Sequence, residues 1–257
     1  MIKETIKNRK NQRVVALIEE SQNSKGLVFV MHGLSGNKEE LHIQAIAEAF
    51  KEQDYSVIRF DTTNTFGESE GQFEDATVTN YYEDLEDVIE WSRKQKWYKE
   101  PFVLAGHSLG SICILLFAEK FQSKVKALAP ISTVISGKLS LETKSHSQDI
   151  EEWKRGGVLV WKGHSGRIKR LKWSHMEDRL RYDVLKDINK IKVPVLLIVG
   201  EKDESTPVKH QKILYDALKC EKEFHIIKES EHTFKESKEL TELKSLFEYW
   251  IKKLNSN

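Results

Sequence analysis

The sequence predicts an α/β protein, with a mostly parallel β-sheet that carries helices on both of its faces. Unbroken apolar runs such as residues 27–31 and 193–200 are typical of strands that are covered on both sides. These runs alternate with longer segments in which apolar residues recur at helical spacing, as in a parallel sheet with crossover helices. At 257 residues, the chain fits one large domain with room for an insertion.

In the first half of the chain, strands and helices alternate in a regular order. Apolar runs predict strands over residues 12–19, 27–31, 55–60 and 102–106, the first of them at a sheet edge. Apolar positions along one side predict helices over residues 39–50 and 80–97, and a buried helix follows residue 108.

The second half continues this alternation after one long interruption. Strands are predicted over residues 125–130, 193–200 and 223–228, with helices over residues 207–218 and 240–254. About sixty residues separate the first two of these strands, far more than a simple crossover needs. We therefore expect a core of residues 1–131 and 191–257, with residues 132–190 inserted as a cap over the strand ends.

The predicted cap is basic. Residues 133–190 contain 13 Lys and Arg against 8 Asp and Glu, and five of these basic residues lie in the run 162–172. Such a run is typical of the solvated face of a helix, but it is also what a lid attracting an acidic substrate or partner would carry. Trp153, Trp161 and Trp173 would line a pocket or form a dimer contact, and the sequence leaves a homodimer open.

The charge balance points to no charged macromolecular partner. With 41 Lys and Arg against 40 Asp and Glu, we expect neither a nucleic acid nor an anionic membrane as partner. The first ten residues lack the apolar core of a secretory signal, and the longest apolar run, 112–118, is too short to span a bilayer. Cys113 and Cys220 make no disulfide framework, and Cys113 is expected to be a small buried residue. These features favour a cytoplasmic protein.

A serine flanked by glycines stands between an apolar strand and an apolar helix. The pattern Gly106-x-Ser108-x-Gly110 is what a nucleophile elbow requires, because its sharp turn forces the serine into a strained conformation. Glycine at the flanking positions lets the strand and the helix approach closely. The helix would then direct its free N–H groups and positive dipole end toward the hydroxyl. Ser108 is therefore the predicted nucleophile.

The acid that such a serine requires is predicted in a loop after a later strand. A serine hydroxyl needs a base to take its proton and an acid to orient that base. Both are expected after the serine in chain order, at the carboxyl ends of strands. Asp203 follows the strand at 193–200 directly and is the first choice, ahead of Glu204 and then Glu201.

The predicted base is His232, which lies in a loop directly after the strand at 223–228. His225 lies inside that strand, where it is expected to be an ordinary sheet side chain. His210 lies on a helix before the strand. His232 is therefore the histidine that completes the order serine, acid, histidine.

The tetrahedral intermediate of acyl transfer also needs two N–H donors for its oxyanion. One is expected from the main chain of Leu109, the residue after the nucleophile. The second is expected from the loop after residue 31, with the amide of Leu34 as donor. Gly33 would let the main chain close on the substrate, and His32 would hold the loop by a hydrogen bond.

Together these motifs resemble the serine hydrolases of the α/β-hydrolase superfamily, and more narrowly the bacterial carboxylesterases of the cinnamoyl or feruloyl esterase type, close to the monoacylglycerol-lipase-like hydrolases. The resemblance implies an eight-stranded, mostly parallel sheet with a cap after the sixth strand. It also implies a serine carboxylesterase that hydrolyses small-molecule esters through an acyl-enzyme, with no cofactor and no metal. The segments that carry it are residues 30–37, 59–61, 67–73, 104–110, 199–203 and 231–234.

Two departures from the esterase pattern leave the substrate open. Residues 132–190 do not align with a cinnamoyl-esterase cap, and Leu34 stands where those esterases frequently have an aromatic residue. The same triad also serves thioesters, acyl transfer and amide or peptide bonds, so a thioesterase, an acyltransferase or a peptidase stays an alternative. A non-catalytic binding protein with this fold is a third, although such proteins normally lack a triad member.

Overall fold

The computed structural model describes residues 1–143, 150–163 and 166–256 of the chain. Eight strands form one sheet in the order β1-β2-β4-β3-β5-β6-β9-β10. From β4 to β10 neighbouring strands are parallel, while β2 is antiparallel to both of its neighbours. The mostly parallel sheet of eight strands is thus confirmed. Its strands are β1 (Ile2–Lys7), β2 (Arg13–Glu19), β3 (Gly26–Met31), β4 (Tyr55–Phe60), β5 (Phe102–His107), β6 (Val125–Ile131), β9 (Val195–Gly200) and β10 (Lys222–Ile227).

The strand predicted at the sheet edge, residues 12–19, is instead the second strand, because β1 pairs with it from Ile2 to Lys7. β1 has the character of an edge strand: Ile6 is its one fully buried residue, and its lysines discourage pairing with another chain. A strand with so little buried apolar surface leaves no periodic signal, which is why the apolar pattern does not predict β1.

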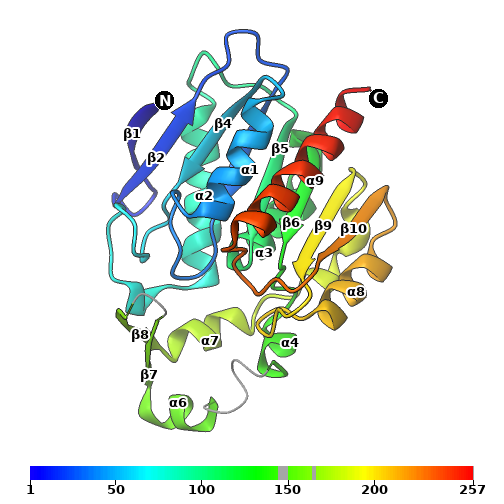
Figure 1. Cartoon of the computed structure of the whole chain (residues 1–257). Coiled ribbons are helices and arrows are strands. Elements are labelled where there is room, and N and C mark those ends of the chain that lie inside the picture. The colour runs from blue at the N-terminus through cyan, green and yellow to red at the C-terminus, as the bar shows by residue number, and fades with distance from the viewer. Residues whose placement is uncertain (144–149, 164–165, 257) are drawn as a thin grey trace.

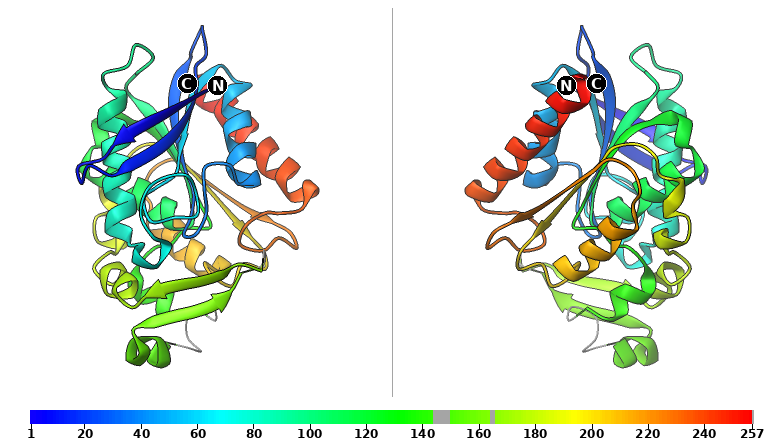
Figure 2. Two further views of the ribbon diagram at one scale, coloured as in Figure 1. Left: turned by 90° about the vertical axis from the view of Figure 1, so that its left-hand side faces the viewer. Right: turned by 90° about the vertical axis from the view of Figure 1, so that its right-hand side faces the viewer.

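Helices cover both faces of the sheet (Figures 1 and 2). On one face, α1 and α9 pack in a cluster with Val28 and Val30 of β3. On the other face, α2, α3 and α8 pack in a cluster with Phe29 and Met31. Alternate residues of a strand point to opposite faces, so the unbroken apolar run of β3 is buried on both sides. These helices are α1 (Leu41–Lys51), α2 (Val78–Ser92), α3 (Leu109–Lys120), α8 (Val208–Ala217) and α9 (Ser237–Ser256).

The predicted helices agree with the structure except at the end of α2. α1, α8 and α9 lie within a few residues of their predicted bounds. α2 ends at Ser92, whereas the prediction extended it to residue 97. Beyond Ser92, the amides of Lys94 and Gln95 bond to carbonyls three residues back, so the chain tightens into turns.

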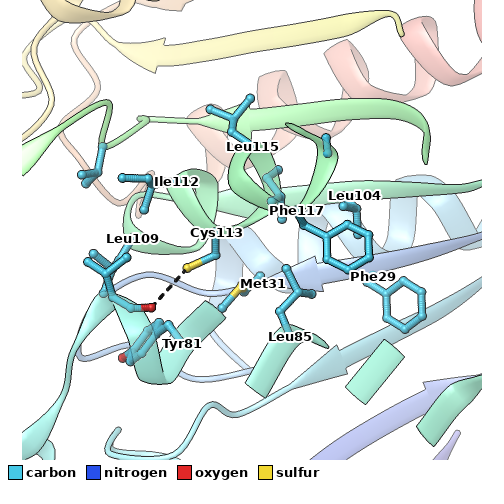
Figure 3. Packing of buried hydrophobic residues seen from close by; sticks show 14 of the residues in the cluster. Phe29, Met31, Tyr81, Leu85, Leu104, Leu109, Ile112, Cys113, Leu115 and Phe117 are labelled. Atoms are coloured by element: carbon cyan, nitrogen blue, oxygen red, sulfur yellow. Dashed lines mark hydrogen bonds between the residues drawn. The ribbon is translucent and has the colours of Figure 1, made fainter. Parts of the chain in front are cut away.

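α3 is apolar on nearly all sides because other elements cover it all round. It packs on β5 and β6, against α2, and against part of the segment that follows β6. Figure 3 shows Cys113 of α3 in one cluster with Met31 of β3 and Leu85 of α2. Cys113 is fully buried, as predicted. None of the helices in the described part of the chain, α3 included, has both the length and the apolar composition that crossing a bilayer requires.

Within the predicted insertion, residues 132–190, the described elements from α4 to α7 lie beyond one end of the sheet (Figures 1 and 2). One of the two interpretations of the basic run 162–172 placed it on a helix face, but its described residues belong to an antiparallel strand pair, the β7–β8 hairpin. The cause is local: the apolar residues of β7 are β-branched or bulky, which favours a strand, and Gly166 has a φ of 79°, which suits a turn. The described helices and strands of this segment are α4 (Gly137–Leu141), α6 (Ile150–Gly156), β7 (Val158–Lys162), β8 (Ile168–Lys172) and α7 (Ser174–Arg179). The short 3-10 turns in the described part of the chain are η1 (Phe73–Asp75), η2 (Gln122–Lys124), η3 (Val184–Lys186) and η4 (Ile188–Lys190).

The three tryptophans of the inserted segment pack it together and against the sheet domain. Trp153 is 2% exposed, and its indole N–H donates to the carbonyl oxygen of Leu171 at 2.9 Å. Its ring meets that of Trp173 edge to face at 5.4 Å. Trp161 lies 6.0 Å from the ring of Phe73 in η1. These rings thus join the hydrophobic cluster on the α2 and α3 side of the sheet, and none lines the cavity described below.

Candidate active site

Ser108 occupies a strained turn between β5 and α3. Its φ of 54° and ψ of −112° lie where non-glycine residues are rarely found. A Cβ at Gly106 would lie 2.8 Å from the main chain of Gly110, and a Cβ at Gly110 would lie 2.6 Å from the carbonyl oxygen of His32. Only glycine fits these two contacts, so the conformation and the close approach predicted for this turn are confirmed.

The structure brings Ser108, His232 and Asp203 together in one line of hydrogen bonds. His232 Nε2 lies 2.9 Å from Ser108 Oγ. On the other side of the ring, His232 Nδ1 lies 2.8 Å from Asp203 Oδ2. The side chain of Asp203 is fully buried, while that of His232 is 24% exposed. The imidazole therefore faces the site with one nitrogen and the protein interior with the other.

Asp203 is held as a carboxylate. Burial alone would raise the pKa of Asp203, but the charge of His232, the hydrogen bond to its imidazole and the bonds from Thr206 outweigh this and hold the pKa below its ordinary value. The amides of Ser205 and Thr206 donate to Oδ1 at 2.9 and 2.8 Å, and the Thr206 hydroxyl donates to Oδ2 at 2.8 Å. Thr206 was not predicted; it lies three residues after the acid, a spacing typical of a local side-chain bond.

The competing residues have other partners. Glu201 accepts a hydrogen bond from the amide of Glu229 at 2.9 Å, and Glu204 is an exposed residue. His225 lies in β10 with its Nε2 at 3.3 Å from Glu223. His210 is buried in α8. Of the predicted acids and bases, Asp203 and His232 are the pair within hydrogen-bond distance of one another.

A close main-chain contact joins the loop of the acid to the loop of the histidine. A Cβ at Gly200 would collide with the carbonyl oxygens of Ser230 and Glu231. The amide of Lys202 donates to the carbonyl of Ser230 at 2.8 Å. The end of β9 therefore fixes the distance between the two loops, and Gly200 permits it.

The loop after β3 lies against Ser108. A Cβ at Gly33 would lie 2.9 Å from Ser108 Cβ and 2.9 Å from His107 Nδ1. His32 holds this loop as expected: its Nδ1 lies 2.7 Å from the carbonyl oxygen of Gly33, and its Nε2 accepts from the amide of Thr62 at 3.1 Å. Gly33 thus brings the main chain close to the serine itself.

The amides of Leu34 and Leu109 remain available at this junction. Within residues 1–143, 150–163 and 166–256, neither amide has a hydrogen-bond acceptor. Leu109 is the first residue of α3, where N–H groups have no intrahelical partner and the positive end of the helix dipole lies. Leu34 lines the same cavity as Ser108.

A buried ion pair anchors the far end of the loop. The Lys38 ammonium, 1% exposed, donates to Asp61 at 2.8 Å and to Glu68 at 2.6 Å. The Lys38 amide also donates to Asp61, at 2.7 Å. Removing one member of such a pair would leave a buried charge without its partner. The ion pair therefore limits the movement of the chain between His32 and Lys38.

His107 is a site residue that the sequence did not reveal. Its Nε2 lies 2.7 Å from the main-chain oxygen of His232, and its ring lies 4.8 Å from the His232 ring. Burial is the main cause that holds the pKa of His107 well below its ordinary value, so the ring is neutral and its Nε2 donates. Its place in the elbow, between Gly106 and Ser108, was the one available signal, but that position accepts many residue types.

Ser108 and His232 open into a cavity of about 720 Å³, a size typical of small-molecule sites. Leu34, Phe66 and Phe234 supply apolar wall. The β7–β8 hairpin reaches the cavity with Arg167 and Lys169, and Lys235 lines it from the loop after His232. The acidic side chains in the wall are Glu39, Glu40 and Glu231.

These groups can perform nucleophilic acyl transfer. Imidazole within hydrogen-bond distance of a serine hydroxyl can accept its proton, and the buried carboxylate behind the ring can stabilise the imidazolium that forms. Two free main-chain amides beside the serine can stabilise a developing oxyanion.

The chain matches the family described as serine aminopeptidase, S33, over residues 22–182. Among curated proteins, an Escherichia coli protein described as "Uncharacterized 31.7 kDa protein in traX-finO intergenic region" is 25% identical over 224 residues, which cover 75% of this chain and 77% of that protein.

Two solved structures share the fold over almost the entire chain. Est1E from Butyrivibrio proteoclasticus, with bound ferulic acid, has a TM-score of 0.80 at 22% identity and covers 99% of this chain and 100% of its own. Mouse alpha/beta hydrolase domain-containing protein 10 has a TM-score of 0.80 at 21% identity, with 99% and 100% covered. At these identities the likeness shows the fold alone, and it confirms the α/β-hydrolase fold that the motifs implied.

Proposed function

The chain belongs to the serine aminopeptidase S33 family of α/β hydrolases, and we propose that it is a serine carboxylesterase acting on small-molecule esters. In this proposal Ser108 is the nucleophile, His232 the general base and Asp203 the acid that orients the base. Residues 132–190 form a cap over the site, and residues 1–131 and 191–257 form the hydrolase core.

The proposed reaction proceeds through an acyl-enzyme. Ser108 Oγ attacks the ester carbonyl carbon while His232 Nε2 takes the hydroxyl proton, and Asp203 stabilises the imidazolium. The imidazolium gives this proton to the leaving alcohol as the carbon–oxygen bond of the ester breaks. His232 then deprotonates a water molecule as it attacks the acyl carbon. The bond from this carbon to Ser108 Oγ breaks, the imidazolium returns its proton to Oγ, and the carboxylic acid leaves.

The amides of Leu34 and Leu109 would bind the oxyanion of both tetrahedral intermediates. Preorganised donors are effective because no solvent has to reorganise when the charge develops. The contact of Gly33 with Ser108 supports this role, since it keeps the loop that carries Leu34 beside the nucleophile. His107 would act as a positioning residue through its bond to the main chain of His232.

The observation that carries the proposal is the unbroken line of hydrogen bonds from Ser108 through His232 to the buried Asp203. A serine in an ordinary surface turn is not expected to contact a histidine whose other ring nitrogen is bonded to a buried carboxylate. The strained φ of Ser108 adds support, because strain of this kind gathers at functional sites.

Replacing Ser108 by Ala tests the nucleophile. We expect hydrolysis of p-nitrophenyl butyrate and labelling by a fluorophosphonate probe to be lost, with thermal unfolding nearly unchanged. Ser205 lines the same cavity, so Ser205→Ala is the matched control and should keep its labelling. Full activity in Ser108→Ala would assign the reaction to another residue, and failure of the probe to label the native chain would favour a non-catalytic protein.

Hydrolysis of amide bonds is the second candidate, because the family description names a serine aminopeptidase. The same triad can cleave esters, thioesters and amides. Comparing p-nitrophenyl esters, acetyl-CoA and amino-acid naphthylamides separates these activities. The carboxylesterase proposal requires the highest kcat/KM on the esters.

A further inference from the structure

Three cationic side chains line the cavity in front of Ser108. Arg167, Lys169 and Lys235 all line it, and in the part of the chain that the structure describes no carboxylate lies within 4.0 Å of any of them. The neighbouring basic residues of the hairpin differ. Arg170 pairs with Glu74 at 3.4 Å, and Lys172 pairs with Asp75 at 2.5 Å. Within the described part of the hairpin, Arg170 and Lys172 thus carry paired charges outside the cavity, whereas Arg167 and Lys169 line the cavity without an ion pair.

Lys169 lies next to the loop proposed to bind the oxyanion. Its ammonium donates to Ser35 Oγ at 2.7 Å, and Ser35 directly follows Leu34. The Lys169 side chain is half-buried; burial, together with the charges of Arg167 and Lys235, outweighs the opposing charge of Glu40 and lowers the pKa of Lys169. An ammonium in this environment gains by taking up a negative ligand, because the ligand offsets both the lost water and the like charges.

Arg167 is held over an aromatic ring of the same cavity. Its guanidinium carbon lies 4.7 Å from the centre of the Phe66 ring, and the Lys169 ammonium lies 5.7 Å from that centre. A cation–π contact orients the guanidinium but leaves its N–H fork free to bind a carboxylate or a phosphate. The positive charges of Arg167 and Lys169 therefore both lie beside the Phe66 ring, at one side of the cavity.

The acidic residues of the cavity offset these charges only in part. Glu39 pairs with Lys38 at 3.5 Å, and Glu231 is an exposed residue. Burial raises the pKa of Glu40 to about 7, so near neutral pH this carboxyl is only partly ionised. Glu40 lies within electrostatic reach of both Lys169 and His232, which places the cationic side of the cavity near the reacting groups.

We propose that Arg167 and Lys169 form an anion-binding subsite beside Ser108, and that the preferred substrate is an ester with a carboxylate or phosphate group on the part that lies under the β7–β8 hairpin. This inference rests on the proposed esterase function. Lys235, in the loop after His232, adds to the positive field. The site would select its substrate by charge, in addition to shape.

Matched pairs of esters test the subsite on the full chain. With the charge on the acyl side, mono-p-nitrophenyl adipate is compared with p-nitrophenyl hexanoate. With the charge on the alcohol side, p-butyryloxybenzoate and p-butyryloxyphenyl phosphate are compared with methyl p-butyryloxybenzoate. We expect kcat/KM to favour the charged member by about tenfold in at least one pair, and added salt to reduce this preference. Equal values in every pair would overturn the inference.

The variants Lys169→Gln and Arg167→Gln show which residues carry the preference. We expect each to lower the ratio of charged to neutral kcat/KM by about tenfold. Because both substrates are measured on one preparation, an unfolded fraction cancels from the ratio. Arg170→Gln is the matched control: it removes one positive charge from the same strand outside the cavity and should leave the ratio unchanged.

Two results would contradict the subsite, and both leave the proposed function standing. A proportional loss on charged and neutral esters in Lys169→Gln would mean that Lys169 only supports the loop through Ser35. A ratio that falls as much in Arg170→Gln would mean that the general field of the hairpin acts, and no local site. Absence of hydrolysis on every neutral and charged ester by the native chain would instead contradict the esterase function itself.

Discussion

Ser108 keeps its unfavourable φ of 54° because the residues around it leave no alternative. Gly106 and Gly110 touch one another, and the carbonyl oxygen of His32 lies against Gly110. The amide of Ser108 is bound to the carbonyl of Ile131 at 2.9 Å. These contacts come from β3, β5 and β6, so three strands hold one residue in place. The conformation of Ser108 is therefore held by the sheet as well as by the turn.

Gly33→Ala tests whether the approach of the oxyanion loop to Ser108 matters for turnover. The new Cβ would lie 2.9 Å from Ser108 Cβ, so the loop must move away and carry the amide of Leu34 with it. Loss of one oxyanion donor lowers kcat by about 10²–10³, and we expect a loss of this size on p-nitrophenyl butyrate. Gly156→Ala is the control, because its Cβ meets nothing within 4 Å. Equal kcat in the two variants would contradict the role of the loop.

Glu119 in α3 couples folding stability to pH. Burial is the main cause that raises its pKa from 4.5 to about 8, with the charges of Asp187 and Asp183 adding to it. Between these pH values the folded chain keeps a proton that the unfolded chain has released. The contribution of Glu119 is therefore fully present below pH 4.5, and it is lost as the pH rises through about 8.

Glu119→Gln removes this titration and tests its sign. We expect the melting temperature of the variant, relative to the native chain, to rise steadily from pH 5 to pH 8 as the native carboxyl is forced to ionise. Differential scanning calorimetry across that range measures the trend. A difference that stays constant with pH would show that the proton on Glu119 does not contribute to folding.

At the scale of elements, the β7–β8 hairpin is the part whose position decides the character of the cavity. It is a two-stranded sheet, and such a sheet is marginal by itself. Trp153 of α6 supports β8 from one side through its bond to Leu171, and Glu74 and Asp75 of η1 hold Arg170 and Lys172 from the other. The buried indole is expected to contribute more to this support than the ion pairs do, since exposed ion pairs contribute little.

Trp153→Ala should therefore loosen the hairpin as well as destabilise the fold. Truncating a buried aromatic residue typically costs about 3–5 kcal/mol, and we expect a loss of that size in the free energy of unfolding in urea. The preference for charged esters should fall in the same variant, because Arg167 and Lys169 are carried by the hairpin. Tyr249→Ala is the control, since Tyr249 is 66% exposed. A stable variant with an unchanged preference would show that α6 does not position β8.

At the scale of the whole molecule, the candidate site lies where the carboxyl ends of parallel strands meet. β3 ends in the loop with Gly33, β5 ends at Ser108, β9 ends before Asp203 and β10 ends before His232. In the sheet these strands are neighbours or nearly so, although up to two hundred residues separate them in sequence. Parallel pairing brings all four loops to one edge, which is the position that α/β sheets use for binding and catalysis.

The sequence by itself determined most of this arrangement. Unbroken apolar runs and helical spacing are local properties, so they predicted seven of the eight strands of the sheet and the α/β fold class. The residues directly after those strands were then the candidates for the serine, the acid and the histidine, and the structure brings Ser108, Asp203 and His232 within hydrogen-bond distance.

Only the tertiary structure decided the features that depend on contacts between distant residues. β1 exists because it pairs with β2, and the hydrogen bond from His107 to His232 joins residues far apart in the chain. The basic run became a hairpin, and only its position over the cavity separates the charges of Arg167 and Lys169 from the paired Arg170 and Lys172. A pattern of residue types shows which side chains carry charge, whereas folding decides which of those charges meet a partner.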